Sequence, residues 1–76
     1  MNKLELKGKR VSKGLKQSDV AIELGITAKT FCVYENSDRC KFDLDQIKEL
    51  SRLYCLNLDD INIIFFDKQL PIGNEK

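Results

Sequence analysis

The spacing of the apolar residues constrains the fold of this chain more than any other feature. Apolar side chains recur at steps of three and four along the sequence rather than at every second position. This is the period of α-helices and not of β-strands. Because glycines and helix-capping residues interrupt the pattern at short intervals, it predicts a compact all-α fold of five short helices.

The first predicted helix covers residues 3–13. Its apolar side chains are expected to fall on one side, which would hold Leu4, Val11 and Leu15. Gly8 lies on the same stretch and would let a second helix approach closely. Gly14 suits the end of the helix, because glycine adopts the left-handed backbone conformation without strain.

The second predicted helix, residues 17–24, carries Val20, Ala21 and Leu24 and stops at Gly25. Ile26 is expected to point back into the core. The hydroxyl of Thr27 can accept a hydrogen bond from a following amide and so begin a third helix, which runs to residue 36. The inward side chains predicted for this third helix are Thr30, Phe31 and Tyr34.

Residues 36–39 contain turn formers and are predicted to be a loop. Asp43 can cap a fourth helix, and Asn57 can cap a fifth. The buried stripe expected on the fourth helix is made of Leu44, Ile47, Leu50, Leu53 and Tyr54. The apolar positions expected on the fifth are Leu58, Ile61, and Ile64 or Phe65.

The chain has 76 residues, which is enough for one domain and too short for a two-domain enzyme. Residues 1–66 are predicted to form this domain and residues 67–76 a flexible tail. The longest uninterrupted apolar run covers residues 63–66, far short of the roughly 20 residues of a membrane span. The first residues alternate charge with leucine and do not resemble a signal peptide. We therefore expect an unprocessed cytoplasmic protein without membrane association.

Residues suited to catalysis or metal binding are scarce. The chain has no histidine, and its three cysteines are not in C-x-x-C spacing. Neither a zinc site nor a disulfide is expected, and the cysteines are interpreted as small, partly buried apolar residues. No phosphate-binding glycine loop or nucleophile elbow is present. We expect no enzyme activity, no cofactor and no small-molecule ligand.

Charge is distributed unevenly along the chain. Residues 1–41 hold nine Lys or Arg and five Asp or Glu, a formal charge of +4, whereas residues 42–76 hold four bases and seven acids, a charge of −3. This asymmetry favours a first half that faces an anionic partner. The alternative is a chance scatter of solubilising charge.

The segment from Gln17 to Asn36 has the composition of a helix-turn-helix. Such a motif needs two helices that cross at about 90–120° over a short turn that often contains glycine. Here Ala21 is small at the expected crossing, Gly25 permits the turn, Ile26 anchors it and Thr27 restarts a helix. A generic helical hairpin is the alternative.

Residues 10–17 read Arg-Val-Ser-Lys-Gly-Leu-Lys-Gln, followed by Val20-Ala21, Leu24-Gly25-Ile26-Thr27 and Tyr34-Glu35-Asn36. With the later leucines and residues 56–61, this pattern resembles the phage Cro and repressor class of DNA-binding domains, the XRE-like helix-turn-helix family. The resemblance covers residues 3–61. Three positions depart from the family pattern: Lys16 replaces a capping Thr, Ser37 replaces a glycine, and Lys41 or Phe42 stands near a usual proline.

The resemblance implies that the third helix enters the DNA major groove while the second crosses the backbone. If Phe31 and Tyr34 are buried, the outward, base-facing positions are Ala28, Lys29, Cys32 and Val33. The methyl groups of Ala28 and Val33 suit a thymine methyl, and Lys29 suits guanine. Cys32 is either a base contact or a bystander at the groove edge, and Lys29 is alternatively a solvated surface lysine.

Further roles follow from the resemblance. The expected contacts with DNA phosphates are made by Gln17, Thr27, Asn36, Arg39 and Lys41. For the residues after the third helix, an ordinary loop role is the alternative. The family also pairs the positions of Arg10 and Glu35 as an ion pair between the first and third helices, which would fix their orientation.

The sequence therefore predicts a sequence-specific double-stranded DNA-binding transcriptional regulator, a repressor of phage or mobile-element type, that binds its operator as a homodimer. The surface expected at the dimer contact is apolar residues 63–66, although these residues can instead complete the core. The alternative function is a helical protein-interaction module that binds another regulator or polymerase rather than DNA.

Overall fold

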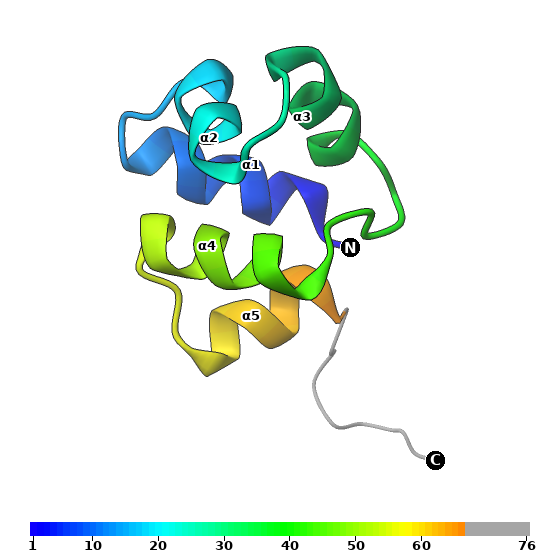
Figure 1. The fold of residues 1–76 in the computed structure, drawn as a ribbon. Helices are drawn as coiled ribbons and strands as arrows, with labels where there is room; N and C mark the ends of the chain where they lie inside the picture. The colour runs from blue at the N-terminus through cyan, green and yellow to red at the C-terminus, as the bar shows by residue number, and fades with distance from the viewer. Residues whose placement is uncertain (67–76) are drawn as a thin grey trace.

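Five α-helices contain most of the residues that the structure, a computed structural model, describes, which are residues 1–66 (Figure 1). In chain order they are α1 (Lys3–Ser12), α2 (Gln17–Leu24), α3 (Ala28–Glu35), α4 (Leu44–Tyr54) and α5 (Leu58–Phe65). No strand occurs within residues 1–66. The predicted all-α fold of five helices is confirmed. The predicted tail, residues 67–76, lies outside the described residues.

The helices pack around a shared centre. Helix α2 lies against both α3 and α4, and α1 lies against α3 and α5. Figure 1 shows α1 passing between the α2–α3 pair and the α4–α5 pair. Residues 25–27 join α2 to α3 and complete the predicted helix-turn-helix. None of the helices within residues 1–66 is long and apolar enough to cross a membrane.

Local hydrogen bonds set where the helices begin and end. The predicted caps are present: Oγ1 of Thr27 accepts from the amide of Thr30 at 3.0 Å, and the side chains of Asp43 and Asn57 each accept from an amide three residues on at 2.8 Å. Gly25 ends α2 in the left-handed conformation, with φ of 72°. These bonds satisfy amides that the helices themselves leave unpaired.

Lys16, the residue before α2, does not accept a hydrogen bond through its side chain. Instead, the carboxylate of Asp19 reaches back and accepts from the backbone amide of Lys16 at 2.9 Å. An acidic side chain in the first turn also suits the positive end of the helix dipole. Helix α2 is therefore anchored by Asp19 rather than by the residue that precedes it.

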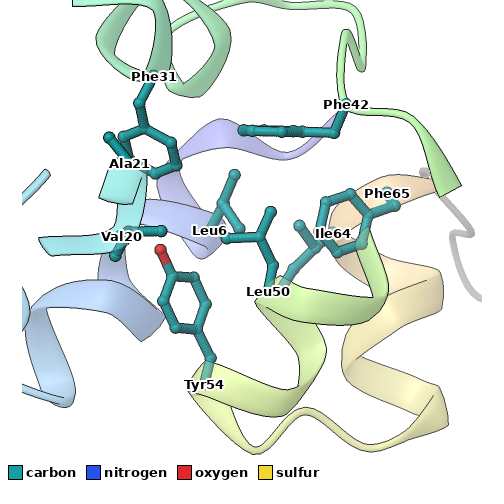
Figure 2. Packing of buried hydrophobic residues seen from close by; sticks show 9 residues of the cluster. All are labelled: Leu6, Val20, Ala21, Phe31, Phe42, Leu50, Tyr54, Ile64 and Phe65. Atoms are coloured by element: carbon teal, nitrogen blue, oxygen red, sulfur yellow. The ribbon is translucent and has the colours of Figure 1, made fainter. Parts of the chain in front are cut away.

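The core lies where the five helices and the α3–α4 loop converge. Figure 2 shows its nine buried apolar residues, which are Leu6, Val20, Ala21, Phe31, Phe42, Leu50, Tyr54, Ile64 and Phe65. The ring centroids of Phe42 and Phe31 are 5.8 Å apart. Those of Phe42 and Tyr34 are 5.4 Å apart, and these two rings are in an edge-to-face arrangement. Phe42 therefore anchors the α3–α4 loop to the core.

The prediction of which side of α1 is buried was wrong for Leu4 and Val11, whereas Leu15, which was named with them, packs against the core. Leu4 is 78% exposed and Val11 57% exposed, whereas Leu6 and Arg10 are buried. A Cβ atom added to Gly8 meets nothing within 4 Å, so no helix approaches there. The side was misassigned because Arg10 is charged, and its burial depends on a partner from α3 that helical periodicity does not reveal.

One further apolar position differs from expectation, and residues 63–66 divide between the two roles that the sequence left open. Leu44 was predicted to belong to the buried stripe of α4 but is 65% exposed, because it opens the helix on the side away from Leu50 and Tyr54. At the end of α5, Ile64 and Phe65 complete the core, while Ile63 and Phe66 stay exposed. Only part of residues 63–66 is therefore free to meet another molecule.

Candidate nucleic-acid interface

One side of α3 is packed and the other is open. Phe31 and Glu35 are buried, and Tyr34 packs against the core. On the other side, Ala28, Lys29 and Val33 are exposed, with Val33 at 51%. The predicted outward face of α3 is therefore not covered by the rest of the described chain. Cys32, the fourth residue predicted there, is partly buried.

Asn36 folds back on the end of α3 instead of extending away from it. Its Nδ2 donates to the carbonyl oxygen of Cys32 at 2.8 Å and approaches the Cys32 sulfur at 3.5 Å. This contact places the thiol beside an amide group at the edge of the open face. The predicted phosphate contact of Asn36 would use the remaining hydrogen-bonding capacity of this side chain.

Thr27 stands exposed at the start of α3. Its hydroxyl donates to the Thr30 hydroxyl at 2.9 Å while it accepts from the Thr30 amide. Because its only hydroxyl hydrogen is donated to Thr30, a phosphate contact at this position would use the backbone amide of Thr27 or would require the hydroxyl hydrogen to turn away from Thr30.

Arg10 and Glu35 form an ion pair between α1 and α3. Arg10 Nε lies 2.8 Å from Glu35 Oε2, and the two residues are 8% and 1% exposed. A second guanidinium nitrogen approaches Glu35 Oε1 at 3.4 Å, and a third donates to the carbonyl oxygen of Leu15 at 2.8 Å. The guanidinium therefore links three segments: α1, the turn before α2, and the end of α3.

Gln17 joins this ion pair from the first turn of α2. Its Nε2 donates to Glu35 Oε1 at 2.8 Å, and its side chain is partly buried. The sequence predicted Gln17 as a phosphate contact and did not predict its bond to Glu35. The two residues are eighteen positions apart, so no local pattern in the sequence signals the contact.

An open hollow lies where α1, the start of α2 and the start of α3 meet. Its lining includes Lys7 and Val11 of α1, residues 16–18 and Ala28. Two lysines and the side-chain amide of Gln17 thus line one concave surface, and their positive charge and hydrogen-bond donors favour an anion. Sequence reasoning missed Lys7. The spacing of the basic residues could have indicated it, since residues 3, 7 and 10 share one side of a helix.

The loop between α3 and α4 carries Arg39 and Lys41, both exposed. It is tied to α1 because Lys3 Nζ lies 2.8 Å from Asp38 Oδ1 and 3.5 Å from the carbonyl oxygen of Asn36. The hydrogen bond and charge of Lys3 hold the pKa of the Asp38 carboxyl below its ordinary value. Ser37 Oγ accepts from the Arg39 amide at 3.2 Å, which stabilises the turn after α3.

Acidic side chains gather elsewhere. A second hollow lies between α2 and the start of α4. Its acidic lining residues are Glu23, Asp43, Asp45 and Glu49. Arg52 contacts both Glu23 and Glu49. No group of three or more His, Cys, Asp or Glu within residues 1–66 is arranged to hold a metal ion. Basic and acidic side chains therefore line different hollows of the folded domain.

Comparisons with known proteins identify no relative of this chain. No family model, no curated protein and no solved structure matches the chain. The resemblance to the Cro and repressor class therefore rests on the sequence motifs. A small helical fold by itself does not define an activity, so the function depends on the residues exposed on and around α3.

Proposed function

We propose that this protein is a sequence-specific double-stranded DNA-binding transcriptional regulator of the Cro and repressor type, acting in the bacterial cytoplasm. The observation that carries the proposal is the exposed side of α3, on which Ala28, Lys29 and Val33 stand uncovered while Phe31 and Glu35 anchor the helix beneath. In a helix-turn-helix, this is the side that enters the major groove.

Basic and polar side chains lie on both sides of α3 and favour contacts with the DNA phosphate backbone there. Lys7, Lys16 and Gln17 line the hollow before α3, and Arg39 and Lys41 are exposed in the loop after it. Contacts of this kind position a protein on a duplex without reading its sequence. Bases would be read sparsely, through methyl contacts of Ala28 and Val33 with thymine and through Lys29 with guanine.

A homodimer is part of the proposal. One eight-residue helix makes few base contacts, and a two-fold pair would place two such helices on half-sites about 34 Å apart. Ile63 and Phe66, 43% and 55% exposed at the end of α5, supply apolar surface for the contact. Sedimentation equilibrium checks this point, because a monomer both alone and on DNA would eliminate the dimer.

Selection from a library of random duplexes, followed by sequencing, tests the function. We expect an enriched site, and then at least a tenfold affinity loss for Lys29→Glu, because the change places a carboxylate against the bases or phosphates. Lys48→Glu is the matched control, since Lys48 is an exposed lysine of α4, and we expect it to change affinity by less than about threefold. Equal losses for both variants would contradict groove binding by α3.

The alternative is a protein-interaction module that binds another regulator or polymerase. Val11 and Val33, which are 57% and 51% exposed, favour it because an apolar partner could cover them. Salt distinguishes the two functions. DNA affinity falls steeply as salt rises, because lysines and arginines displace condensed counterions, whereas an apolar protein contact is almost insensitive to salt.

A further inference from the structure

Glu35 has more partners than an ion pair requires. Its Oε2 is held by Arg10 Nε at 2.8 Å, and its Oε1 accepts from Gln17 Nε2, also at 2.8 Å. The guanidinium already balances the charge of the carboxylate. The bond from Gln17 therefore serves something other than charge neutralisation.

The chemistry of the carboxylate fixes the orientation of the Gln17 amide. An ionised carboxylate only accepts hydrogen bonds, so it selects the amide rotamer that turns Nε2 inward and rejects the one that turns the carbonyl oxygen inward. Nε2 carries two hydrogens, of which Glu35 Oε1 takes one. The second hydrogen is not used by Glu35, and the Gln17 side chain that carries it lines the hollow between α1, α2 and α3.

We infer that Glu35 is a positioning residue for DNA binding: it holds Gln17 so that the second amide hydrogen is presented to a backbone phosphate in the hollow at the start of α2. The inference rests on the proposed function. It assigns to the buried ion pair a task in binding beyond its part in the architecture.

The arrangement couples phosphate binding to base reading. Gln17 is the first residue of α2 and Glu35 is the last residue of α3. A phosphate bound by Gln17 is therefore linked through one hydrogen bond to the end of the helix that would face the bases. Orientation fixed before binding lowers the cost of ordering the contact, so loss of Glu35 weakens the Gln17 contact even though Gln17 remains.

A double-mutant cycle on the selected duplex tests the inference. Gln17→Ala is measured in the native chain and in an Arg10→Met/Glu35→Leu background, in which the ion pair is replaced by apolar side chains. We expect an affinity loss of about tenfold in the native chain and less than about twofold in the background, because an unpositioned amide contributes little. Equal losses in both would overturn the inference, since an ion pair with a purely architectural role does not act through Gln17.

Lys29→Ala in the same two backgrounds is the control. It should weaken binding by the same factor in both, because Lys29 makes no contact with the ion pair. If Lys29→Ala and Gln17→Ala both lose their effect on affinity in the Arg10→Met/Glu35→Leu background, α3 has moved as a whole and the inference is overturned. Circular dichroism establishes that the background variant is folded at the temperature of the assay.

A second measurement uses the native chain and is independent of that variant. In the nuclear magnetic resonance spectrum, one Nε2 hydrogen of Gln17 should already be shifted downfield in the free protein, and the other should shift when the selected duplex is added. A second hydrogen that does not respond would overturn the inference while leaving DNA binding intact. If the native chain enriches no duplex at all, the proposed function fails as well, so the two failures are distinguishable.

Discussion

Arg10 Nε lies 2.8 Å from Glu35 Oε2 in a pair that is almost completely buried between α1 and α3. Burial removes both charges from water, so each depends on the other for compensation. The pair also orients two helices that share few other contacts with each other. It therefore specifies the angle of α3 more than it adds to stability.

Glu35→Leu should destabilise the domain by about 3–5 kcal/mol, because it leaves the Arg10 guanidinium buried without a counter-charge. Arg10→Met/Glu35→Leu should return the free energy of unfolding to within about 1 kcal/mol of the native value, because no charge remains buried. Urea unfolding followed by circular dichroism measures both. A double variant as unstable as Glu35→Leu would show that the pair itself, and not the stranded charge, carries the energy.

The two leucines of α4 provide a matched pair for the core. Leu50 is fully buried and Leu44 is 65% exposed. Leu50→Ala should lower the free energy of unfolding by about 2–5 kcal/mol, through lost burial and the cavity that remains. Leu44→Ala should change it by less than about 0.5 kcal/mol. Similar losses in thermal or urea unfolding would mean that Leu44 is buried after all, as its position in the sequence pattern suggested.

Gly8 within α1 and Gly25 directly after α2 should respond to replacement by alanine with opposite changes in stability. Gly25 has φ of +72°, where an L side chain is strained, and Gly25→Ala should cost about 1–2 kcal/mol. Gly8 lies in helical conformation, and a Cβ there meets nothing within 4 Å. Gly8→Ala should therefore stabilise the domain by about 0.5–1 kcal/mol through helix propensity. A destabilising Gly8→Ala would indicate a partner on the outer side of α1.

Most helix boundaries were predictable from the sequence because they depend on local chemistry. Thr27, Asp43 and Asn57 begin helices through bonds to amides three residues on, and Gly25 ends one through its left-handed backbone. Such signals span a few residues and need no knowledge of the tertiary structure.

The buried side of α1 and the contacts of Gln17 were not predictable in this way. Burial of Arg10 instead of Val11 depends on where Glu35 arrives from α3, twenty-five positions away. Likewise, Phe42 enters the core through the path of a loop that has no periodicity of its own. Long-range contacts depend on helix crossing angles, which local patterns do not encode.

The Lys3–Asp38 contact predicts an effect of pH. Lys3 lowers the pKa of the Asp38 carboxyl in the folded state, so the folded protein binds fewer protons than the unfolded chain at acid pH. The stability from this contact is present above about pH 4 and is lost as pH falls through the lowered pKa. In a magnetic resonance titration, Lys3→Met should raise the pKa of Asp38 towards its ordinary value, whereas Lys7→Met should not. An unchanged titration in Lys3→Met would refute the contact.

Tyr54 places its hydroxyl in the core, where it has no hydrogen-bond partner among the described residues (Figure 2). Burial, with a smaller contribution from the charge of Glu35, raises the pKa of this hydroxyl well above its ordinary value. Tyr54→Phe should therefore raise the free energy of unfolding at neutral pH by about 1 kcal/mol, because an unpaired polar group leaves the interior.

The same substitution should change how stability depends on alkaline pH. Above about pH 10 the unfolded chain releases the Tyr54 proton and the folded chain retains it, so the native protein loses stability as pH rises. Tyr54→Phe removes this loss, and its free energy of unfolding should fall less steeply between about pH 9 and pH 12. Urea unfolding at several pH values measures both slopes. Parallel slopes would mean that the Tyr54 hydroxyl ionises as readily in the folded chain as in the unfolded one, and that it is not confined to the core.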